Sequence, residues 1–337
     1  MSDLDITPFT PEDDAAALAL ENRCTQGTSL KIKFRRTTFR ARSELYENAV
    51  IYCARRGGEI IGVAAGALKT VHLHGASVRA LYGYDLRVHP DHRNEGVGKR
   101  LSAAVLADIG RNADCIYTLV NGQNEPALGL VRRNFSPRVE IPLTYVLIPV
   151  PERIDPAANW RITRRAEIRN QHARRAPEIE FVPDRDETRM AGFVAGLSLT
   201  GRFEAGCSLW SNERILAEQV VAVPVKYRIL RMLSPLARPF MEWPPIPRPG
   251  EIVRSWFLFD IFAEGGESVK QLLDAAKRFA RSCGRTYLYA LLQNDDPLLD
   301  EIRRSGTRMF TFPYLFLAKG GAVPDPTDHL YLDVRDL

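Results

Sequence analysis

The chain has 337 residues, of which 45% are hydrophobic and 26% are charged, a composition typical of soluble globular proteins. This length exceeds what a single core usually holds, so we expect two domains, residues 1–150 and 151–337. The net charge of +5 excludes little, because a mild basic excess suits an anionic cofactor as readily as nucleic acid.

Hydropathy and the first residues argue against a membrane location. No apolar run approaches the roughly 18 residues that a membrane helix needs. The start Met-Ser-Asp-Leu-Asp has neither the basic residues nor the apolar core of a signal peptide. We therefore expect a cytoplasmic protein with no membrane partner. The five cysteines are far apart and lack Cys-x-x-Cys spacing, so we expect them to be reduced and structural.

The first element in chain order is a helix. Thr10 suits the N-cap, Pro11 suits the first helical position, and the helix should run on through Ala15 to about Asn22. The stretch 31–42 then carries six basic residues and no acid. It is either a solvated basic face or part of a site for an acidic acceptor.

Three strands are expected next, joined as an antiparallel meander. The runs 50–55 and 60–71 flank Gly57-Gly58, a pair that suits a tight hairpin turn. Gly75 marks the turn into a third strand, 81–89, which alternates Tyr82, Tyr84, Leu86 and Val88 on one predicted face. His72 and His74 are two residues apart, but no cysteine or carboxylate is near them in the sequence, so we predict no metal site.

The third strand leads into a basic glycine turn and a helix over 99–109. Pro90 ends the strand, and Arg93-Asn94-Glu95-Gly96-Val97-Gly98 places two glycines where backbone N–H groups can approach an anion. Arg93, Lys99 and Arg100 add positive charge at the helix N-terminus. The turn fits neither the Walker loop nor the dinucleotide fingerprint, since both need further residues that are missing here. It predicts a pyrophosphate site.

A strand over 115–120 should lie parallel to the 81–89 strand after a right-handed crossover. A helix is expected over 125–134, and the segment 135–150 should supply the last strands of the first domain. The second half repeats this order faintly, with Asp260 in the place of Asp85, a helix over 268–282 and a strand over 287–292. Its turn, 263–267, has two acids and no base, which makes a poor cradle for pyrophosphate.

Two further segments of the second half have plainer readings. Six arginines gather between positions 161 and 175, but no aromatic platform is interleaved with them, so we do not expect nucleic-acid binding. The stretch Met241–Gly250 is rich in proline and reads as a rigid connector, or as a ligand for a partner.

The glycine turn resembles that of the GNAT acetyltransferases. Arg93, Gly96 and Gly98 match the family's Arg-x-x-Gly-x-Gly form, and residues 86–92 match the strand end that precedes it. The resemblance implies that acetyl-CoA is the cofactor. The implied cofactor-binding residues are Leu86, Arg87, Val88, Arg93, Asn94, Glu95, Gly96, Val97, Gly98, Lys99, Arg100 and Asn124. The family's usual catalytic tyrosine on the next helix is replaced by Val131, which puts acid catalysis from that helix in doubt.

The whole chain is similar to tandem-GNAT proteins of the plant HOOKLESS type and their bacterial relatives. The most specific part of this likeness is the C-terminal segment 330–337, Leu-Tyr-Leu-Asp-Val-Arg-Asp-Leu. The fold class implied is α/β, with an α+β mixed sheet and two tandem GNAT folds, of which the second is degenerate. The second domain would regulate the first or shape its acceptor site.

The implied reaction moves an acetyl group to an amine by direct attack on the thioester. We expect Asp85, or Tyr82 through water, to act as the base, although Asp85 also suits a structural role. The acceptor is an amine on a small molecule or a protein, and a homodimer is compatible with the sequence. Two alternatives stay open: a small amino-sugar acceptor, as in mycothiol synthase, or a non-catalytic acyl-CoA-binding regulator.

Overall fold

The computed structural model describes residues 4–337 except 26, 28–30, 152–153, 155–158, 176–177, 185–189, 202–203, 226, 230 and 233–245. Half of the Pro-rich connector Met241–Gly250 therefore lies outside the described residues. Among those described, no helix combines the length and the apolar character that crossing a membrane requires.

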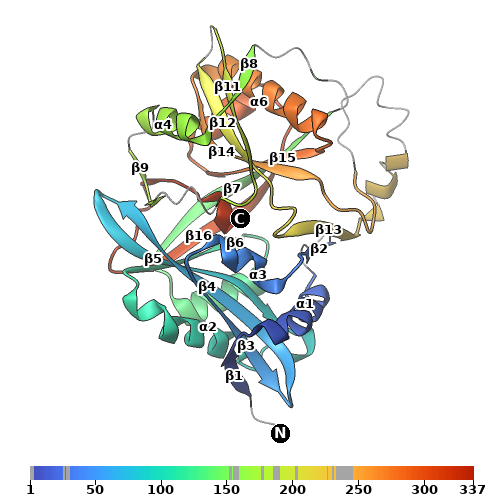
Figure 1. Ribbon diagram of the computed structural model, residues 1–337, viewed down its shortest axis with the longest axis vertical. Helices are drawn as coiled ribbons and strands as arrows, with labels where there is room; N and C mark the ends of the chain where they lie inside the picture. Colours follow the sequence, from blue (N-terminus) through green and yellow to red (C-terminus); the bar gives the residue numbers. More distant parts are fainter. Residues whose placement is uncertain are drawn as a thin grey trace.

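One long mixed sheet organises the molecule (Figure 1). Its strands follow the order β1 (Asp5–Pro8), β3 (Asn48–Arg56), β4 (Glu59–Leu73), β5 (Ala76–Val88), β6 (Cys115–Asn121), β16 (Phe310–Gly320), β7 (Val139–Pro149), β15 (Tyr287–Gln293), β14 (Ser255–Ala263), β12 (Ala205–Trp210), β11 (Phe193–Leu199) and β8 (Trp160–Thr163). The short β10 (Val182–Pro183) pairs with β4 off this path. Neighbours are antiparallel except β5 with β6 and β14 with β15. The mixed sheet predicted from the sequence is confirmed.

Helices and short elements complete the fold. The α-helices are α1 (Asp14–Arg23), α2 (Val97–Asp108), α3 (Glu125–Phe135), α4 (Arg165–Arg175), α6 (Gly265–Ser282) and α7 (Pro297–Arg304). Short 3-10 helices are η1 (Pro11–Asp13), η2 (Phe39–Leu45), η3 (Pro90–His92), η4 (Gly110–Asn112) and η6 (Val334–Asp336). Two small sheets pair β2 (Lys31–Arg35) with β13 (Ala217–Ala222) and β9 (Ile179–Glu180) with β17 (His329–Leu330).

The second half repeats the first, element by element. The order β1, α1, β3, β4, β5, α2, β6, α3, β7 is followed by β8, α4, β11, β12, β14, α6, β15, α7, β16. The repeat is closed by an exchange of last strands. β16 pairs with β6 of the first half, and β7 pairs with β15 of the second half, while β7 and β16 also pair with each other. The segment 135–150 does form a strand as expected, but its partners belong to the second half.

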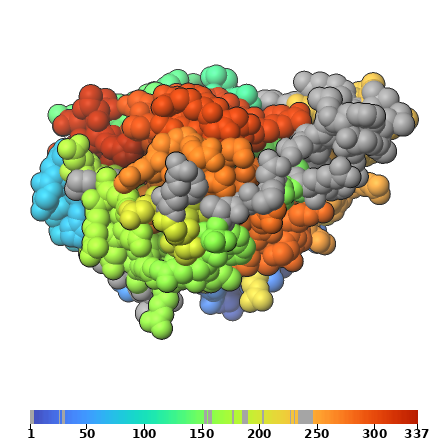
Figure 2. All heavy atoms as spheres, turned by 90° about the horizontal axis from the view of Figure 1, so that it is seen from above, coloured from blue at the N-terminus to red at the C-terminus, as the bar shows by residue number. Residues whose placement is uncertain are grey.

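The sheet has an outer and an inner face, and each carries its own core. α2 covers the outer face of the first half through Leu101 and Val105, and α6 covers the outer face of the second half through Leu272 and Leu273. On the inner face both halves share one large core that includes Tyr82, Tyr117 and Phe257. Seen from above in Figure 2, residues of the second half, coloured green to red, make up most of the visible face.

A β-bulge corrects one prediction for β5. Asp85 has φ +51°, and the register with β4 shifts between Ala65 and Val63. The side chains of Tyr82 and Tyr84 therefore join the inner core, whereas Leu86 and Val88 join the outer one beneath α2. The prediction that these four share one face is wrong, because period-two alternation does not survive a bulge.

Candidate functional site

The predicted glycine turn lies at the N-terminus of α2. Gly96 caps this helix with φ +79°, and the first helical-type bond runs from the Arg100 N–H to the Gly96 carbonyl at 3.1 Å. The N–H groups of Val97, Gly98 and Lys99 belong to the first turn of the helix, where no intrahelical partner exists. They add to the positive end of the helix dipole. This turn has the geometry of an anion site.

Some charged side chains around the turn remain beside it, and others are engaged in contacts with the rest of the protein. Arg87 lies beside the strand end, where it stacks on Phe34, and Lys99 is exposed on α2. Arg100 instead turns back to the first strand region and donates to the Leu4 carbonyl at 2.6 Å. Glu95 pairs with Arg56 at 2.6 Å. Arg100 and Glu95, both expected to bind cofactor, are therefore engaged in holding the turn in place.

Strands β5 and β6 separate next to this turn. Their parallel pairing covers only Ala80 to Tyr82 on β5, and Tyr82 lies opposite Tyr117 on β6. Beyond this point, among the residues that the structure describes, a single hydrogen bond joins the two strands. The Thr118 hydroxyl donates it to the Gly83 carbonyl at 2.9 Å. The edge of β5 from residue 83 to 88 thus has backbone groups without a ladder partner on the β6 side. We refer to this opening as the first splay.

Asp85 lies at the bulge beside the first splay, and its carboxylate is enclosed by arginines. Arg36 Nη1 lies 2.8 Å from it, Arg42 Nη1 3.4 Å, and Arg87 Nη2 3.7 Å. Burial alone would raise the pKa of this carboxyl, but the three guanidinium groups outweigh burial and hold the pKa well below its usual range. A carboxylate so stabilised accepts a proton poorly, so the geometry favours the structural role of Asp85.

Tyr82, the other expected base, is also engaged. Its hydroxyl donates to the Asp336 carbonyl at 2.5 Å, and Arg42 Nη2 approaches the same hydroxyl at 3.2 Å. Burial raises the pKa of Tyr82 well above its usual value. The C-terminal segment thus reaches the first splay from the second half, and its Asp336 carboxylate also accepts from Lys69 at 2.8 Å and from Tyr117 at 2.5 Å.

The basic stretch 31–42 is not a uniform solvated face. Arg36 and Arg42 are buried in the Asp85 network, and Arg36 also pairs with Glu21 on α1. Arg40 is exposed and pairs with Glu44 within η2 at 2.8 Å. This division was not predictable from the sequence, because Asp85, the acid that Arg36 and Arg42 share, lies more than 40 residues away in the chain.

Helix α3 closes the outer side of the site. Leu130 of α3 lies 3.0 Å from where a Cβ on Gly98 would stand, which explains the small residue there. Asn124 caps α3 by accepting from the Ala127 N–H at 3.3 Å, so its amide serves the helix. Val131 packs with Leu128 and Val120. It brings no acid to the site, in agreement with its apolar side chain.

The second half contains an equivalent splay with opposite charge. β14 and β15 pair in parallel only from Ser255 to Phe257, and Asp260 repeats the bulge with φ +49°. A cavity of about 890 Å³ opens there, and its lining includes Asp260, Glu264, Asp296 and Glu301. The Glu301 carboxylate lies 3.1 Å from the position of a Cβ on Gly266, in the first turn of α6. An acid thus lies against the first turn of α6, where the positive end of a helix dipole would favour an anion.

The inner face of the central strands carries an aromatic surface that sequence analysis missed. Phe310 and Phe312 of β16 are 40% and 37% exposed, and they stand opposite Leu147 and Tyr145 of β7. Tyr145 stacks on Tyr314 with ring centroids 5.4 Å apart. We refer to Phe310, Phe312, Tyr314, Tyr145 and Leu147 as the aromatic surface. Alternation on β16 was visible in the sequence, but its neighbours in the sheet were not.

One carboxyl group faces the aromatic surface. Glu218 of β13 accepts from the Tyr289 hydroxyl at 3.2 Å, and its charge acts on Tyr145 and Tyr314 as well. Burial raises the pKa of Glu218 to about 7. The residue had no signal in the sequence, because β13 pairs with β2 across more than 180 residues.

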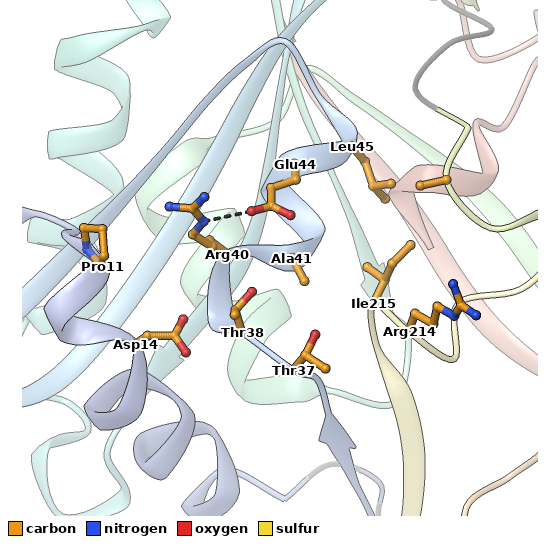
Figure 3. Close-up of a pocket in the computed structure, with 11 residues that line it drawn as sticks. Pro11, Asp14, Thr37, Thr38, Arg40, Ala41, Glu44, Leu45, Arg214 and Ile215 are labelled. Carbon is orange, nitrogen blue, oxygen red and sulfur yellow. Dashed lines mark hydrogen bonds and ion pairs between the residues drawn. The ribbon is translucent and has the colours of Figure 1, made fainter.

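A separate pocket lies at the surface between the two halves (Figure 3). It measures about 620 Å³ and is lined by η2, the start of α1, and the loop that carries Arg214 and Ile215. Arg40 and Glu44 pair with each other along its rim. The pocket is therefore mixed in charge and does not continue the basic glycine turn.

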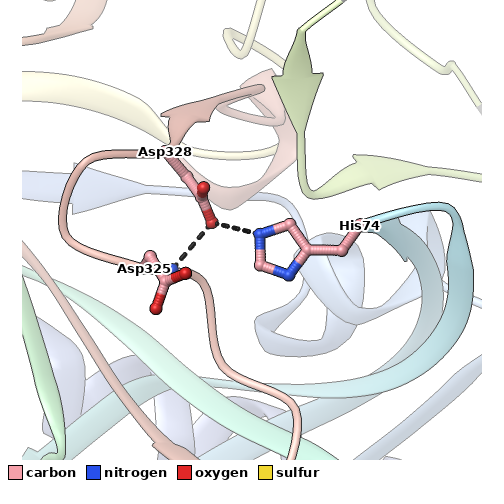
Figure 4. A group of neighbouring side chains, drawn as sticks. All are labelled: His74, Asp325 and Asp328. Carbon is pink, nitrogen blue, oxygen red and sulfur yellow. Dashed lines mark hydrogen bonds and ion pairs between the residues drawn. The ribbon is translucent and has the colours of Figure 1, made fainter.

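His72 and His74, which we expected to lack carboxylate neighbours, each lie beside an aspartate in the fold. His72 pairs with Asp184, and His74 Nε2 lies 2.8 Å from the Asp328 carboxylate. Asp325 joins His74 and Asp328, and within the described part of the chain these three form the only group with metal-ligand spacing (Figure 4). The reason given for excluding a metal was thus wrong, since the fold brings two carboxylates to His74. Asp328 already bonds to both neighbours.

The arginines between 161 and 175 do not form a free basic patch. Arg169 is buried and donates to the Pro183 carbonyl at 3.1 Å, and Arg165 lies 3.7 Å from Asp260. Arg175 pairs with Glu204 and Glu264. With Arg161 paired to Glu167, half of the six arginines are therefore in ion pairs within the second half.

Comparison with known proteins gives a family for part of the chain and several structures of similar fold. Residues 16–135, roughly a third of the chain, match the acetyltransferase (GNAT) family. No curated protein matches the sequence significantly. Among solved structures, N-myristoyltransferase of Saccharomyces cerevisiae with bound myristoyl-CoA superposes with a TM-score of 0.64 at 8% identity, covering 99% of this chain and 86% of that one.

Two other structures share the fold. A protein from Pyrococcus horikoshii described as an acetyltransferase has a TM-score of 0.54 at 11% identity, covering 96% of this chain and 95% of that one. The GCN5-related glucosamine N-acetyltransferase region of a fungal β-N-acetylglucosaminidase has a TM-score of 0.56 at 14% identity, covering 95% of this chain and 38% of that one. The first half thus carries the sequence signature of the GNAT acetyltransferases. The whole chain has the mixed α/β fold shared with N-myristoyltransferase.

Proposed function

We propose that this protein is an acyl-CoA-dependent N-acyltransferase whose donor, acetyl-CoA, is bound by the first half. The observation that carries this proposal is the basic glycine turn at the N-terminus of α2, set beside the first splay. Three first-turn N–H groups and the cations Arg93 and Lys99 suit a pyrophosphate. The GNAT match over residues 16–135 supports the same assignment.

The splay gives the pantetheine arm a path through the sheet. Its amides would pair with the open edge of β5 at Leu86 and Val88, as an added strand does. A backbone N–H at that edge would polarise the thioester carbonyl. The acceptor nitrogen would attack the carbonyl carbon, so that a C–N bond forms while the C–S bond breaks. Coenzyme A leaves as a thiolate, and the acceptor nitrogen gives up one proton.

We assign the cofactor to the first half alone. Glu264 and Glu301 stand near the start of α6, where the second half would need positive charge to hold pyrophosphate. This agrees with the sequence-based prediction of a degenerate second GNAT fold of the HOOKLESS type, residues 151–337. The second half then serves to shape the acceptor side.

The first test replaces the cation of the turn. Arg93→Glu should abolish detectable acetyl-CoA binding in a calorimetric titration, because a carboxylate would face the pyrophosphate. Arg100→Gln is the matched control, since Arg100 contacts the Leu4 carbonyl and should leave affinity within about twofold. Wild-type affinity in the Arg93 variant would show that the cofactor lies elsewhere.

A non-catalytic acyl-CoA-binding regulator is the second candidate. It is favoured by Val131 in the usual tyrosine position and by the engagement of Asp85 and Tyr82 in internal contacts. Release of free thiol from acetyl-CoA in the presence of an amine distinguishes the two. Amine-dependent release would exclude the regulator, and binding without release from any amine would establish it.

A further inference from the structure

The aromatic surface lies next to the first splay, on the same sheet. β16 is the direct neighbour of β6, and β7 follows it. With strands spaced about 4.8 Å apart, the aromatic surface begins one strand from β6 and ends at β7, about 10 Å from β6. Tyr314 pairs with Asn121 at the end of β6, so the surface is continuous with the open end of the splay.

Two properties define what this surface can hold. Phe310 and Phe312 are large apolar side chains that remain exposed in a sheet whose other inner residues are mostly covered. Exposed aromatic groups of this kind commonly mark a binding face. Glu218 stands at the far side, where it bonds to Tyr289 of β15, the third strand from β6.

The titratable side chains that surround Glu218 carry no charge of their own. The titratable groups that face it are Tyr289, Tyr145 and Tyr314, which stay neutral at physiological pH because burial raises their pKa values. Phe34 lies opposite Glu218 on β2. The structure gives Glu218 no ion pair among the described residues, so a cation brought by a ligand would be its first counter-charge.

We propose that the aromatic surface and Glu218 bind a diamine acceptor, with an apolar spacer on the aromatic side chains and the distal ammonium on Glu218. The spacer must bridge about 14 Å, the width of three strand spacings, so that the other amine reaches the first splay. Glu218 is then a specificity residue, since it contacts the amine that is not acylated. This inference rests on the proposed function only for the fate of the proximal amine.

The position of Glu218 explains why the ammonium group that it binds must be the one far from the first splay. Glu218 is too far from β6 to hold the attacking nitrogen, yet it lies within reach of a chain that follows Tyr145 and Tyr314. A monoamine of equal length makes the apolar contacts but leaves Glu218 without a partner. The difference between the two ligands therefore isolates the carboxylate.

The test is a calorimetric titration of the full-length protein at pH 8, without cofactor, with 1,10-diaminodecane and with n-decylamine. We expect the diamine to bind about tenfold tighter, which is typical of one charge-assisted contact. Glu218→Gln should remove this preference. Glu251→Gln, which changes an exposed acid beyond β13, should keep it.

A second variant guards against a folding artefact. Phe312 is exposed, so Phe312→Ala should fold normally and weaken both amines about equally while the preference persists. Equal affinity for the two amines in the wild type, or a preference that survives Glu218→Gln, would overturn the inference. Because the titration needs no cofactor, its failure is distinct from a failure to bind acetyl-CoA.

Discussion

At the scale of single residues, the surroundings of a carboxyl group determine whether it can exchange a proton. The Asp85 carboxylate forms ion pairs with Arg36, Arg42 and Arg87. Among the described residues, the Glu218 carboxylate accepts a hydrogen bond from the Tyr289 hydroxyl and forms no ion pair. The first pKa is depressed and the second is raised to about 7. Two acids on the same inner side of the molecule thus have opposite properties.

Replacing Asp85 tests its structural role. Asp85→Asn leaves Arg42 buried without its carboxylate partner and Arg36 with Glu21 alone, and we expect a loss of about 3–5 kcal/mol in the free energy of unfolding. Urea denaturation measures it. Asp91→Asn, with an 82% exposed side chain near the same turn, should change stability by less than about 0.5 kcal/mol. A similarly small change for Asp85→Asn would argue against the network.

The same network sets the response to acid. Because the pKa of Asp85 is lower in the folded than in the unfolded state, its contribution to stability is complete above about pH 4 and is lost as the pH falls toward the folded pKa. Denaturation midpoints measured between pH 7 and pH 3 should fall more steeply for the wild type than for Asp85→Asn. Parallel curves would contradict this assignment.

At the scale of elements, the position of α2 depends on close contact with β4. A Cβ on Gly66 would lie 2.5 Å from Val105 Cγ1, and one on Gly62 would lie 2.9 Å from Leu101 Cδ1. These glycines let the helix lie directly on the strand. The N-terminus of α2, which carries the proposed cofactor site, is positioned by this packing.

Gly66→Ala should therefore affect both stability and binding. We expect a loss of about 1–3 kcal/mol from overpacking, together with weaker acetyl-CoA binding, because α2 must shift outward. Thermal denaturation and calorimetry measure the two effects. Gly321→Ala has no atom within 4 Å of the added Cβ and should be neutral in both. Unchanged affinity in a destabilised Gly66 variant would separate the helix position from cofactor binding.

Local elements of the site were predictable from the sequence, and long-range ones were not. The turn at Gly96 and the strand and helix beside it follow from signals within about 25 residues, and the structure confirms them. The bulge at Asp85 left no pattern, because alternation of apolar residues continues through it. Arg36 meets Asp85, and Glu218 and Asp336 meet their partners, across distant segments, so no spacing in the sequence could identify these contacts.

At the scale of the whole molecule, the exchange of β7 and β16 joins the two halves. Each half contains a complete set of elements, but its last strand pairs with the other half. β6 of the first half pairs with β16, and β15 of the second half pairs with β7. The C-terminal segment adds further ties, since Lys69 of β4 pairs with Asp333 and Asp336. The two repeats therefore depend on each other for closure of the sheet.

Separating the halves tests this dependence. Residues 1–150 produced alone would leave β6 and β7 with open edges, so we expect an aggregated or poorly structured fragment. The full chain should unfold in one cooperative transition, followed by circular dichroism and by tryptophan fluorescence. A soluble, folded 1–150 fragment that binds acetyl-CoA would show that the exchange is dispensable.

The exchanged strand β16 also determines how late in protein synthesis the sheet can close. β16 begins at Phe310, so the edge of β6 that ends at Asn121 waits for almost the entire second half to be translated. At about 5–20 residues per second this delay amounts to roughly 10–40 s. During that time the ribosome displays an open, apolar strand edge, and the nascent chain becomes a natural client for a chaperone that masks such edges.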